Sequence, residues 1–162
     1  MSSKIQTTAT SFLKNQKIAE FNEWRLGNLT VRFNLDGSDL SNLDLSSALL
    51  NGVSCIGCDF SRSKLRRANI VQSDLSKAHF ENSDLSTALM MYSDLTECNL
   101  SHSDLTRTNL MWSNLSYSDL SYCVLTRTIL VESNMSHTNL TGVDMSTAFL
   151  KYAKIDSTKS PI

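Results

Sequence analysis

Hydrophobic residues recur at every fifth position through most of the chain, from Leu35 to Ile155 without an exception. Five steps turn an α-helix by about 140°, so this period does not keep apolar side chains on one helical face. In a strand, an odd period sends successive side chains to opposite faces. The backbone must instead bend once per five residues, always the same way. This pattern predicts a solenoid with the fifth-position residues, here called the central residues, inside it.

The positions around each central residue repeat as well. The residue two before it is usually small, the residue just before it is usually Asp or Asn, and Ser or Thr follows it. The asparagine or aspartate is interpreted as a turn residue, because its side chain can accept hydrogen bonds from nearby backbone N–H groups. Clear copies of this pattern are Ser73–Lys77, Ser83–Thr87, Ser103–Arg107 and Ser118–Tyr122.

These copies resemble the repeats of the pentapeptide-repeat protein family, over about residues 31–156. The resemblance implies an all-β fold, a right-handed quadrilateral β-helix (β-solenoid) with four pentapeptides and therefore twenty residues per coil. It also implies a bacterial protein. Serine is commoner than alanine at the small position, which departs from the family pattern and predicts a slightly looser core.

A twenty-residue coil makes a prediction that the sequence can test, since residues twenty apart should stack in columns of similar character. One small-residue column reads Ala48, Ala68, Ala88, Thr108, Thr128 and Ala148, and another reads Ser73, Ser93, Ser113 and Ser133. The span of the central residues then corresponds to about six coils. At roughly 4.8 Å between stacked strands, this makes a rod on the order of 30 Å long.

The segment before the repeats has helical spacing. Leu13, Ile18, Phe21 and Trp24 fall within an arc of about 140° on a helix, and Thr10 or Ser11 can serve as its N-cap. We expect a short N-terminal α-helical cap over the open end of the solenoid. The predicted organisation is a leader and cap over residues 1–30, a β-helix over 31–156 and a tail over 157–162. The tail is too short to cover the last coil well, and a second subunit could cover that end.

Charge and composition narrow the function classes. The 162 residues carry 15 Lys and Arg against 16 Asp and Glu, a net charge of −1, so no strong field is available to hold nucleic acid or an anionic membrane. No apolar stretch approaches the roughly 18 residues of a membrane helix, and the start of the chain has no apolar signal core. A cytoplasmic location is expected. Reduced thiols buried in the core are therefore expected at Cys55, Cys58, Cys98 and Cys123.

The outward columns contain one group of apolar exceptions. Where other faces have Asp, Asn, Ser or Thr, three adjacent columns carry Leu89, Met91, Tyr92, Met111, Trp112, Ile129, Val131, Phe149 and Tyr152. Monomers rarely expose large apolar patches, and Trp, Tyr and Met are enriched at interface cores. We favour a protein-binding or homodimer face. The alternative is that residues 1–30 or the C-terminal tail fold back over it.

Several residue groups look chemical but are better explained by the repeat. Ser101–Asp104 has the residue types of a hydrolase triad, yet neighbours on an extended segment diverge. Cys55 and Cys58 have metal-ligand spacing, but both are inward positions and no second pair exists. His79, His102 and His137 belong to different outward columns. We therefore predict no catalytic residue, metal site or cofactor, and a protein that is not an enzyme.

A local basic strip is the remaining charged feature. It comprises Arg62, Lys64, Arg66 and Arg67 within one coil, together with Arg107 and Arg127 in the outward column of Arg67. Two interpretations stay open, a phosphate-binding strip and an ordinary solvated edge.

These features favour a non-enzymatic interaction protein. We expect a rigid rod that forms a homodimer or docks an unidentified partner protein. We expect no direct binding of nucleic acid or membrane. The resemblance adds an alternative, because some pentapeptide-repeat proteins mimic duplex DNA and bind DNA gyrase, protecting it from drugs or toxins. That model requires a strongly acidic rod. From Val31 onward the chain has eleven Lys and Arg against fourteen Asp and Glu. The resemblance also implies a third class, the docking modules of cyanobacterial signalling proteins and bacterial effectors.

Overall fold

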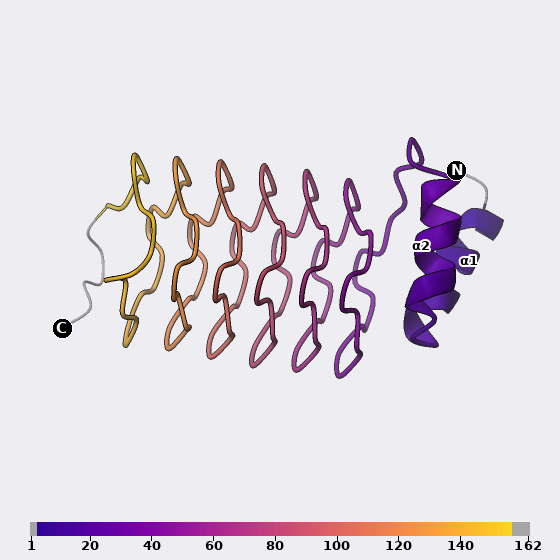
Figure 1. Cartoon of the computed structure of the whole chain (residues 1–162), viewed down its shortest axis with the longest axis horizontal. Coiled ribbons are helices and arrows are strands. Elements are labelled where there is room, and N and C mark those ends of the chain that lie inside the picture. Colours follow the sequence, from indigo (N-terminus) through magenta and orange to yellow (C-terminus); the bar gives the residue numbers. More distant parts are fainter. Residues whose placement is uncertain (1–2, 157–162) are drawn as a thin grey trace.

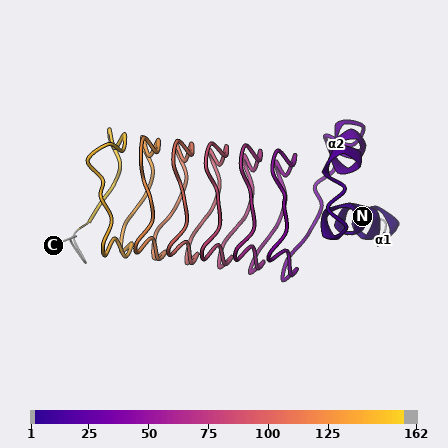
Figure 2. The ribbon, with the colours of Figure 1, turned by 60° about the horizontal axis from the view of Figure 1, so that its bottom comes forward.

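The computed structural model describes residues 3–156, which form two helices followed by a rod of stacked coils. The helices are α1 (Ser3–Lys14) and α2 (Ile18–Leu26). They lie together at one end of the rod, and the repeats run away from them to the C-terminal end (Figures 1 and 2). The fold is a β-solenoid with helices at its N-terminal end.

Parallel β-bridges join each coil to the next, and every one of them links residues twenty apart. The ladder starts with Asn34 and Ser54 and ends with Asn134 and Lys154. Each contact is an isolated bridge, because the chain turns after every five residues. The twenty-residue period that the sequence columns predicted is therefore the register of the structure.

A β-turn follows each central residue. The carbonyl of Leu100 accepts a hydrogen bond from the N–H of Ser103 at 3.1 Å, and the same bond recurs along the rod. The third of the four residues in the turn has a positive φ, 59° at Glu97 and 58° at Trp112, although this left-handed region normally favours glycine. The aspartates stabilise the turns as predicted: Asp74 Oδ1, for example, accepts the N–H of Ser76 at 3.1 Å.

The core is a stack of central residues with small residues at the corners. Central residues such as Leu95 are completely buried, and the rings of Phe60 and Phe80 stack at 4.9 Å. Nearly all serines at the small position are buried too, and most donate their hydroxyls to carbonyls of central residues, as Ser73 does to Leu50. These hydrogen bonds offset the burial of a polar group, so serine at this position is compatible with a close-packed core.

The N-terminal segment differs from the expected single helix with an N-cap at Thr10 or Ser11. Both of these residues lie inside α1, and the chain breaks between the helices at Gln16, which has a φ of 54°. The predicted apolar residues still meet the core: Leu13 and Phe21 are fully buried, while Ile18 and Trp24 pack against it. A left-handed residue redirects the chain, so both short helices can contact the first coil.

Polar side chains of the leader bond to the edge of the first coil. Gln16 Oε1 accepts the N–H of Asp44 at 3.2 Å, and Asn22 Oδ1 accepts the N–H of Leu49 at 2.9 Å. One coil later, the N–H of Lys64 bonds instead to the carbonyl of Leu43 in the preceding coil. The side chains thus supply the acceptors that a preceding coil would supply.

Arg25 of α2 is buried and ties this junction together. Its guanidinium donates to the carbonyls of Asn28, Val31 and Asn51 and lies 5.2 Å from the centre of the Phe33 ring. Burial lowers the pKa of this guanidinium. Three backbone acceptors and an aromatic face compensate for taking the charge out of water.

All four cysteines are free and buried, at the positions where the repeat predicted them. Burial raises the pKa of Cys98 to about 12 and raises the pKa of Cys123, whereas the hydrogen bond from Cys55 lowers the pKa of Cys58. At pH 8 a thiol of pKa about 12 is ionised to only on the order of one part in ten thousand, and the thiolate is the reactive form.

We therefore expect the native protein to react slowly with a thiol reagent, with Cys58 first and Cys98 among the last. Mass spectrometry of timed alkylation at pH 8 measures the order, and urea-unfolded protein gives the unprotected rate. Equal and rapid labelling of all four thiols in the native protein would contradict this assignment.

Candidate protein-binding face

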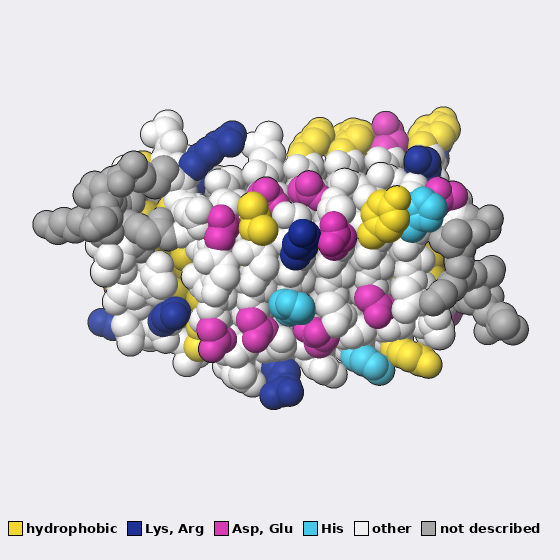
Figure 3. Space-filling view, turned by 180° about the vertical axis from the view of Figure 1, so that it is seen from behind, with side chains coloured by type: hydrophobic (Ala, Val, Ile, Leu, Met, Phe, Trp, Pro, Cys, Tyr) yellow, Lys and Arg dark blue, Asp and Glu magenta, His cyan; other side chains and the backbone are white. Residues whose placement is uncertain are grey.

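The structure brings the nine apolar residues together on one side of the rod. We call this surface the apolar face; it comprises Leu89, Met91, Tyr92, Met111, Trp112, Ile129, Val131, Phe149 and Tyr152. Bridges from Leu89 to Asn109, from Asn109 to Ile129 and from Ile129 to Phe149 align one of its columns. In the view from behind, hydrophobic side chains stand along the part of the upper edge nearer the C-terminal end of the rod, with an acidic side chain among them (Figure 3).

Two stacked aromatic rings lie in one outer column of the apolar face, the column that also holds Glu132. Tyr92 and Trp112 stack with their ring centres 4.8 Å apart and their planes inclined by 11°. Both still expose about half of their surface, 53% and 42% respectively. Their left-handed turn positions, with φ near 58°, hold the two rings one coil apart. The stack is a rigid apolar ridge in contact with solvent.

The apolar substitutions on this face remove turn hydrogen bonds. Asn109 Oδ1 accepts the N–H of Met111 at 3.1 Å, the bond that the repeat normally makes. Leu89 and Ile129 occupy the same position in neighbouring coils and have no side-chain oxygen to accept such a bond. Because these residues give up a local interaction, the stability of the isolated rod does not account for them.

Residues 3–30 of the leader do not cover this face. Its helices lie at the end of the rod (Figures 1 and 2), and their polar contacts reach residues 44–51 of the first coil. Phe149 and Tyr152 are more than half exposed, as Tyr92 is. The other part of the alternative, coverage by the tail, falls on residues 157–162, which lie outside the described residues.

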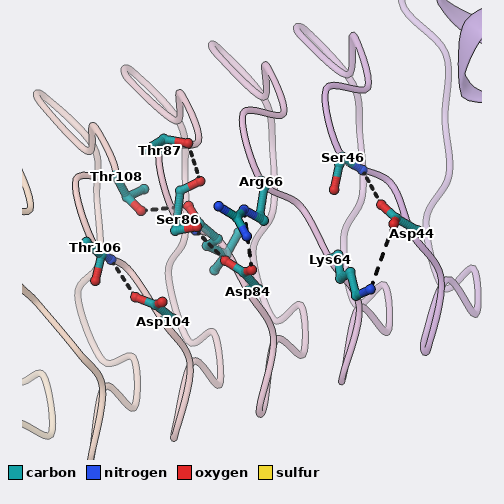
Figure 4. Close-up of polar contacts among 11 residues, drawn as sticks. Asp44, Ser46, Lys64, Arg66, Asp84, Ser86, Thr87, Asp104, Thr106 and Thr108 are labelled. Carbon is teal, nitrogen blue, oxygen red and sulfur yellow. Dashed lines mark hydrogen bonds and ion pairs between the residues drawn. The ribbon is translucent and has the colours of Figure 1, made fainter.

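The basic strip is divided by acidic neighbours. Lys64 Nζ lies 4.0 Å from Asp44, and Arg66 Nε lies 3.7 Å from Asp84 (Figure 4). Both pairs are largely exposed and contribute little to stability. Arg107 and Arg127 lie two and three coils beyond Arg67, with Thr87 intervening in their column, and Arg62 occupies a separate column.

A shallow groove of about 560 Å³ lies beside part of this strip. Arg66, Arg107 and Arg127 line it, but so do Asp84 and Asp104. The two carboxylates reduce the attraction of the groove for a phosphate, so the geometry favours a solvated charged edge over a phosphate site.

The residues that resembled catalytic or metal-binding groups do not converge. Ser103 is buried and donates to the carbonyl of Leu100, whereas the exposed ring of His102 stacks on Tyr122. His137 stacks on Tyr117, and His79 lies 3.7 Å from Glu81. Within residues 3–156, no three His, Cys, Asp or Glu residues gather in a group that could hold a metal ion.

Two features of the structure were not predicted from the sequence patterns described above. One is the burial of Arg25, because nothing in the sequence of a helix indicates that one of its charged residues is buried. The other is the charge beside the apolar face: Arg127 precedes it and Glu132 follows it in the same coil, and neither has an ion-pair partner within residues 3–156. The twenty-residue columns could have revealed this second feature, because they place Arg127 and Glu132 on either side of the apolar columns.

Within the same described range, no helix is long and apolar enough to cross a membrane.

Models of repeat families match the part of the chain that forms the rod. One, for a pentapeptide repeat region, matches residues 58–135, and another, for pentapeptide repeats, matches residues 34–67. The chain belongs to the pentapeptide-repeat family. This confirms the resemblance inferred from the repeats.

Solved structures similar to this pentapeptide-repeat protein include a trypsin-treated form of QnrB1, a plasmid-mediated fluoroquinolone resistance protein. The two sequences are 14% identical, and the alignment covers 78% of this chain and 80% of that chain with a TM-score of 0.53. A pentapeptide repeat protein from the cyanobacterium Cyanothece 51142 has 25% identity, covers 64% and 88%, and has a TM-score of 0.34. HetL from the cyanobacterium Nostoc has 24% identity, covers 76% of each chain, and has a TM-score of 0.26. The QnrB1 likeness supports the fold alone. No curated protein matches the chain.

Proposed function

We propose that this protein is a non-enzymatic interaction module whose apolar face docks another protein surface. The observation that carries the proposal is the stack of Tyr92 and Trp112, which is about half exposed and lies among Met91, Met111 and Leu89. Aromatic and methionine side chains in this setting are typical of the centres of protein interfaces. The partner is a second copy of this chain or a different protein.

The architecture suits this role. We propose a right-handed quadrilateral β-helix of about six coils over residues 31–156, with residues 1–30 forming a cap. The bonds from Gln16, Asn22 and Arg25 to the first coil support the cap, because they occupy edge groups that could otherwise pair with another chain. A rod whose turns are fixed at every fifth residue presents its docking side chains with little loss of conformational freedom.

Gyrase binding remains the alternative function, and a supercoiling assay with purified gyrase addresses it directly. The repeat region from Val31 onward has a net charge of only −3. Exposed arginines such as Arg67, Arg107 and Arg127 interrupt its acidic surface. A rod that mimics DNA should instead carry a dense and continuous negative charge, since duplex DNA has one charge per about 1.7 Å of its axis. The apolar face therefore supports protein docking better than DNA mimicry.

Photo-cross-linking in the native cell tests the docking role. A photoreactive phenylalanine analogue is introduced at Tyr92 on the apolar face, or at Tyr117 as a control. Tyr117 is a matched position because its ring is also exposed, also occupies a left-handed turn and also stacks on the next coil. We expect a discrete protein adduct from position 92 and none from position 117.

The identity of the adduct distinguishes the partners. An adduct with another copy of this chain indicates self-association, and an adduct with a different protein indicates heterologous docking. No adduct from position 92, or equal adducts from both positions, would contradict the proposed docking role.

A further inference from the structure

We propose that the apolar face binds a second copy of this chain, side by side and in the same direction. This inference rests on the proposed docking role of the face and names its occupant. It follows from the charges that border the face, which differ in sign on its two long edges.

The basic edge lies at the turn that leads into the face. Its column contains Arg67, Arg107 and Arg127, and all three side chains are exposed. None of them has an ion-pair partner within residues 3–156. Arg107 and Arg127 are neighbours in the column, and they share the shallow groove with Asp84 and Asp104 without forming an ion pair with either.

The acidic edge lies at the turn that leads out of the face. Glu132 stands in this turn and has no ion-pair partner in the described part of the chain. Asp74 and Asp94 follow in the next outward column, and acidic side chains are visible just below the hydrophobic row in Figure 3. The column at one edge of the apolar face therefore carries arginines that have no ion-pair partner within residues 3–156, and the column at the other edge carries Glu132, which has none either.

Symmetry then selects the direction of the second copy. Two identical faces pack against each other about a two-fold axis in the plane of contact. If the axis runs along the rods, the copies are parallel and each basic edge meets the acidic edge of its partner. If the axis runs across the rods, the copies are antiparallel and the basic edges meet each other. Only the parallel arrangement is electrostatically self-complementary.

The register within each coil strengthens this choice. Arg127 and Glu132 occupy successive left-handed turns of one coil, with φ of 57° and 55°, on opposite edges of the face. In the parallel pair, Arg127 lies level with Glu132 of the partner subunit, and Arg67 lies level with Gln72 of the partner subunit. Arg107 lies level with Trp112 of the partner subunit, and the guanidinium can form a cation–π contact with the indole ring.

The apolar columns also match in this register. Coils of the same number face each other, so Met91 lies opposite Leu89 of the partner subunit and Val131 lies opposite Ile129 of the partner subunit. The contact therefore has an apolar centre and a charged rim, the usual order of a protein interface.

Charge exchange tests the inference with the full-length chain. We would measure the dimer dissociation constant by sedimentation equilibrium for the wild type, Arg127→Glu, Glu132→Arg and the double exchange. Each single change should weaken the dimer about tenfold or more, because like charges then face each other twice. The double exchange should return the constant to within about threefold of the wild type, because the pairs re-form with reversed sign.

Arg62→Glu is the matched control. Arg62 is an exposed arginine at the same turn position, with a φ of 57°, but it lies in a column away from the apolar face. The substitution Arg62→Glu makes the same change in net charge as Arg127→Glu and should leave the dissociation constant of the dimer unchanged. Circular dichroism of every variant verifies that the solenoid is folded.

Three results would overturn the inference. Tighter dimers with Arg127→Glu would indicate antiparallel packing, and failure of the double exchange to restore the dimer would exclude this pairing. A wild type that stays monomeric at high micromolar concentration would exclude the second copy as occupant. In that case an adduct with a different protein from position 92 would still sustain the docking role, so the two proposals fail separately.

Discussion

Leu95→Ala is expected to reduce the free energy of unfolding by about 2–4 kcal/mol. The side chain of Leu95 is completely buried in the column of central residues, between Leu75 and Leu115 one coil away on either side. Backbone bonds fix the coils on both sides: the N–H of Leu95, for example, bonds to the carbonyl of Asn114 at 2.7 Å. The coils cannot close around the missing atoms, so the substitution loses both the transfer free energy and the contacts around a cavity.

Urea unfolding followed by far-ultraviolet circular dichroism measures this change. Thr87→Ala is the control, since Thr87 is exposed at a turn and its replacement should change the stability by less than about 0.5 kcal/mol. A neutral effect of Leu95→Ala would contradict its place in the core. A spectrum dominated by α-helix would contradict the fold itself.

The rod could be predicted because each position in the repeat has one environment. A residue such as Leu75 has a counterpart in the same place in each adjoining coil, so the same requirement recurs every twenty residues and is visible in the columns. The role of the aspartates followed for the same reason. Asp74 bonds to the backbone two residues later, and this local interaction depends only on the neighbouring sequence.

The leader could not be predicted to the same depth. Apolar spacing indicated that Leu13 and Phe21 meet the core, but it did not show the left-handed Gln16 that separates two helices. It also did not indicate that Arg25 is buried, because that burial depends on carbonyls of Val31 and Asn51 brought together only by the fold. Contacts that occur once in a chain leave no periodic signal.

The apolar face was predictable in part. The columns placed Tyr92 and Trp112 next to each other, and the structure adds that their rings are nearly parallel and about half exposed. The charges at the edges of the face gain meaning only with the geometry, since Arg127 and Glu132 are five residues apart and lie on opposite sides of a flat surface. The orientation of a second copy follows from that arrangement and from symmetry.

Trp112→Arg is expected to weaken association through the apolar face by a few kcal/mol without unfolding the rod. Trp112 lies in an outer column of the face beside Met111, stacked on Tyr92 and followed in its column by Glu132. Arginine keeps the outward position but removes the indole, and it introduces a charge into the part of the interface that must lose water. In the parallel dimer, the new arginine also faces Arg107 of the partner subunit.

Sedimentation velocity over a range of concentrations compares wild type with Trp112→Arg, and Tyr122→Arg is the control. Tyr122 is also an exposed aromatic in a left-handed turn, stacked on His102 at 5.0 Å, but it lies on another side of the rod. Its replacement changes the charge in the same way and should leave the dimer intact. Equal weakening by both variants would indicate an effect of net charge. If the wild type remains monomeric at high micromolar concentration and residues 157–162 are found over the face, the apolar surface is internal packing. The tail would then remove the apolar area from water without a partner.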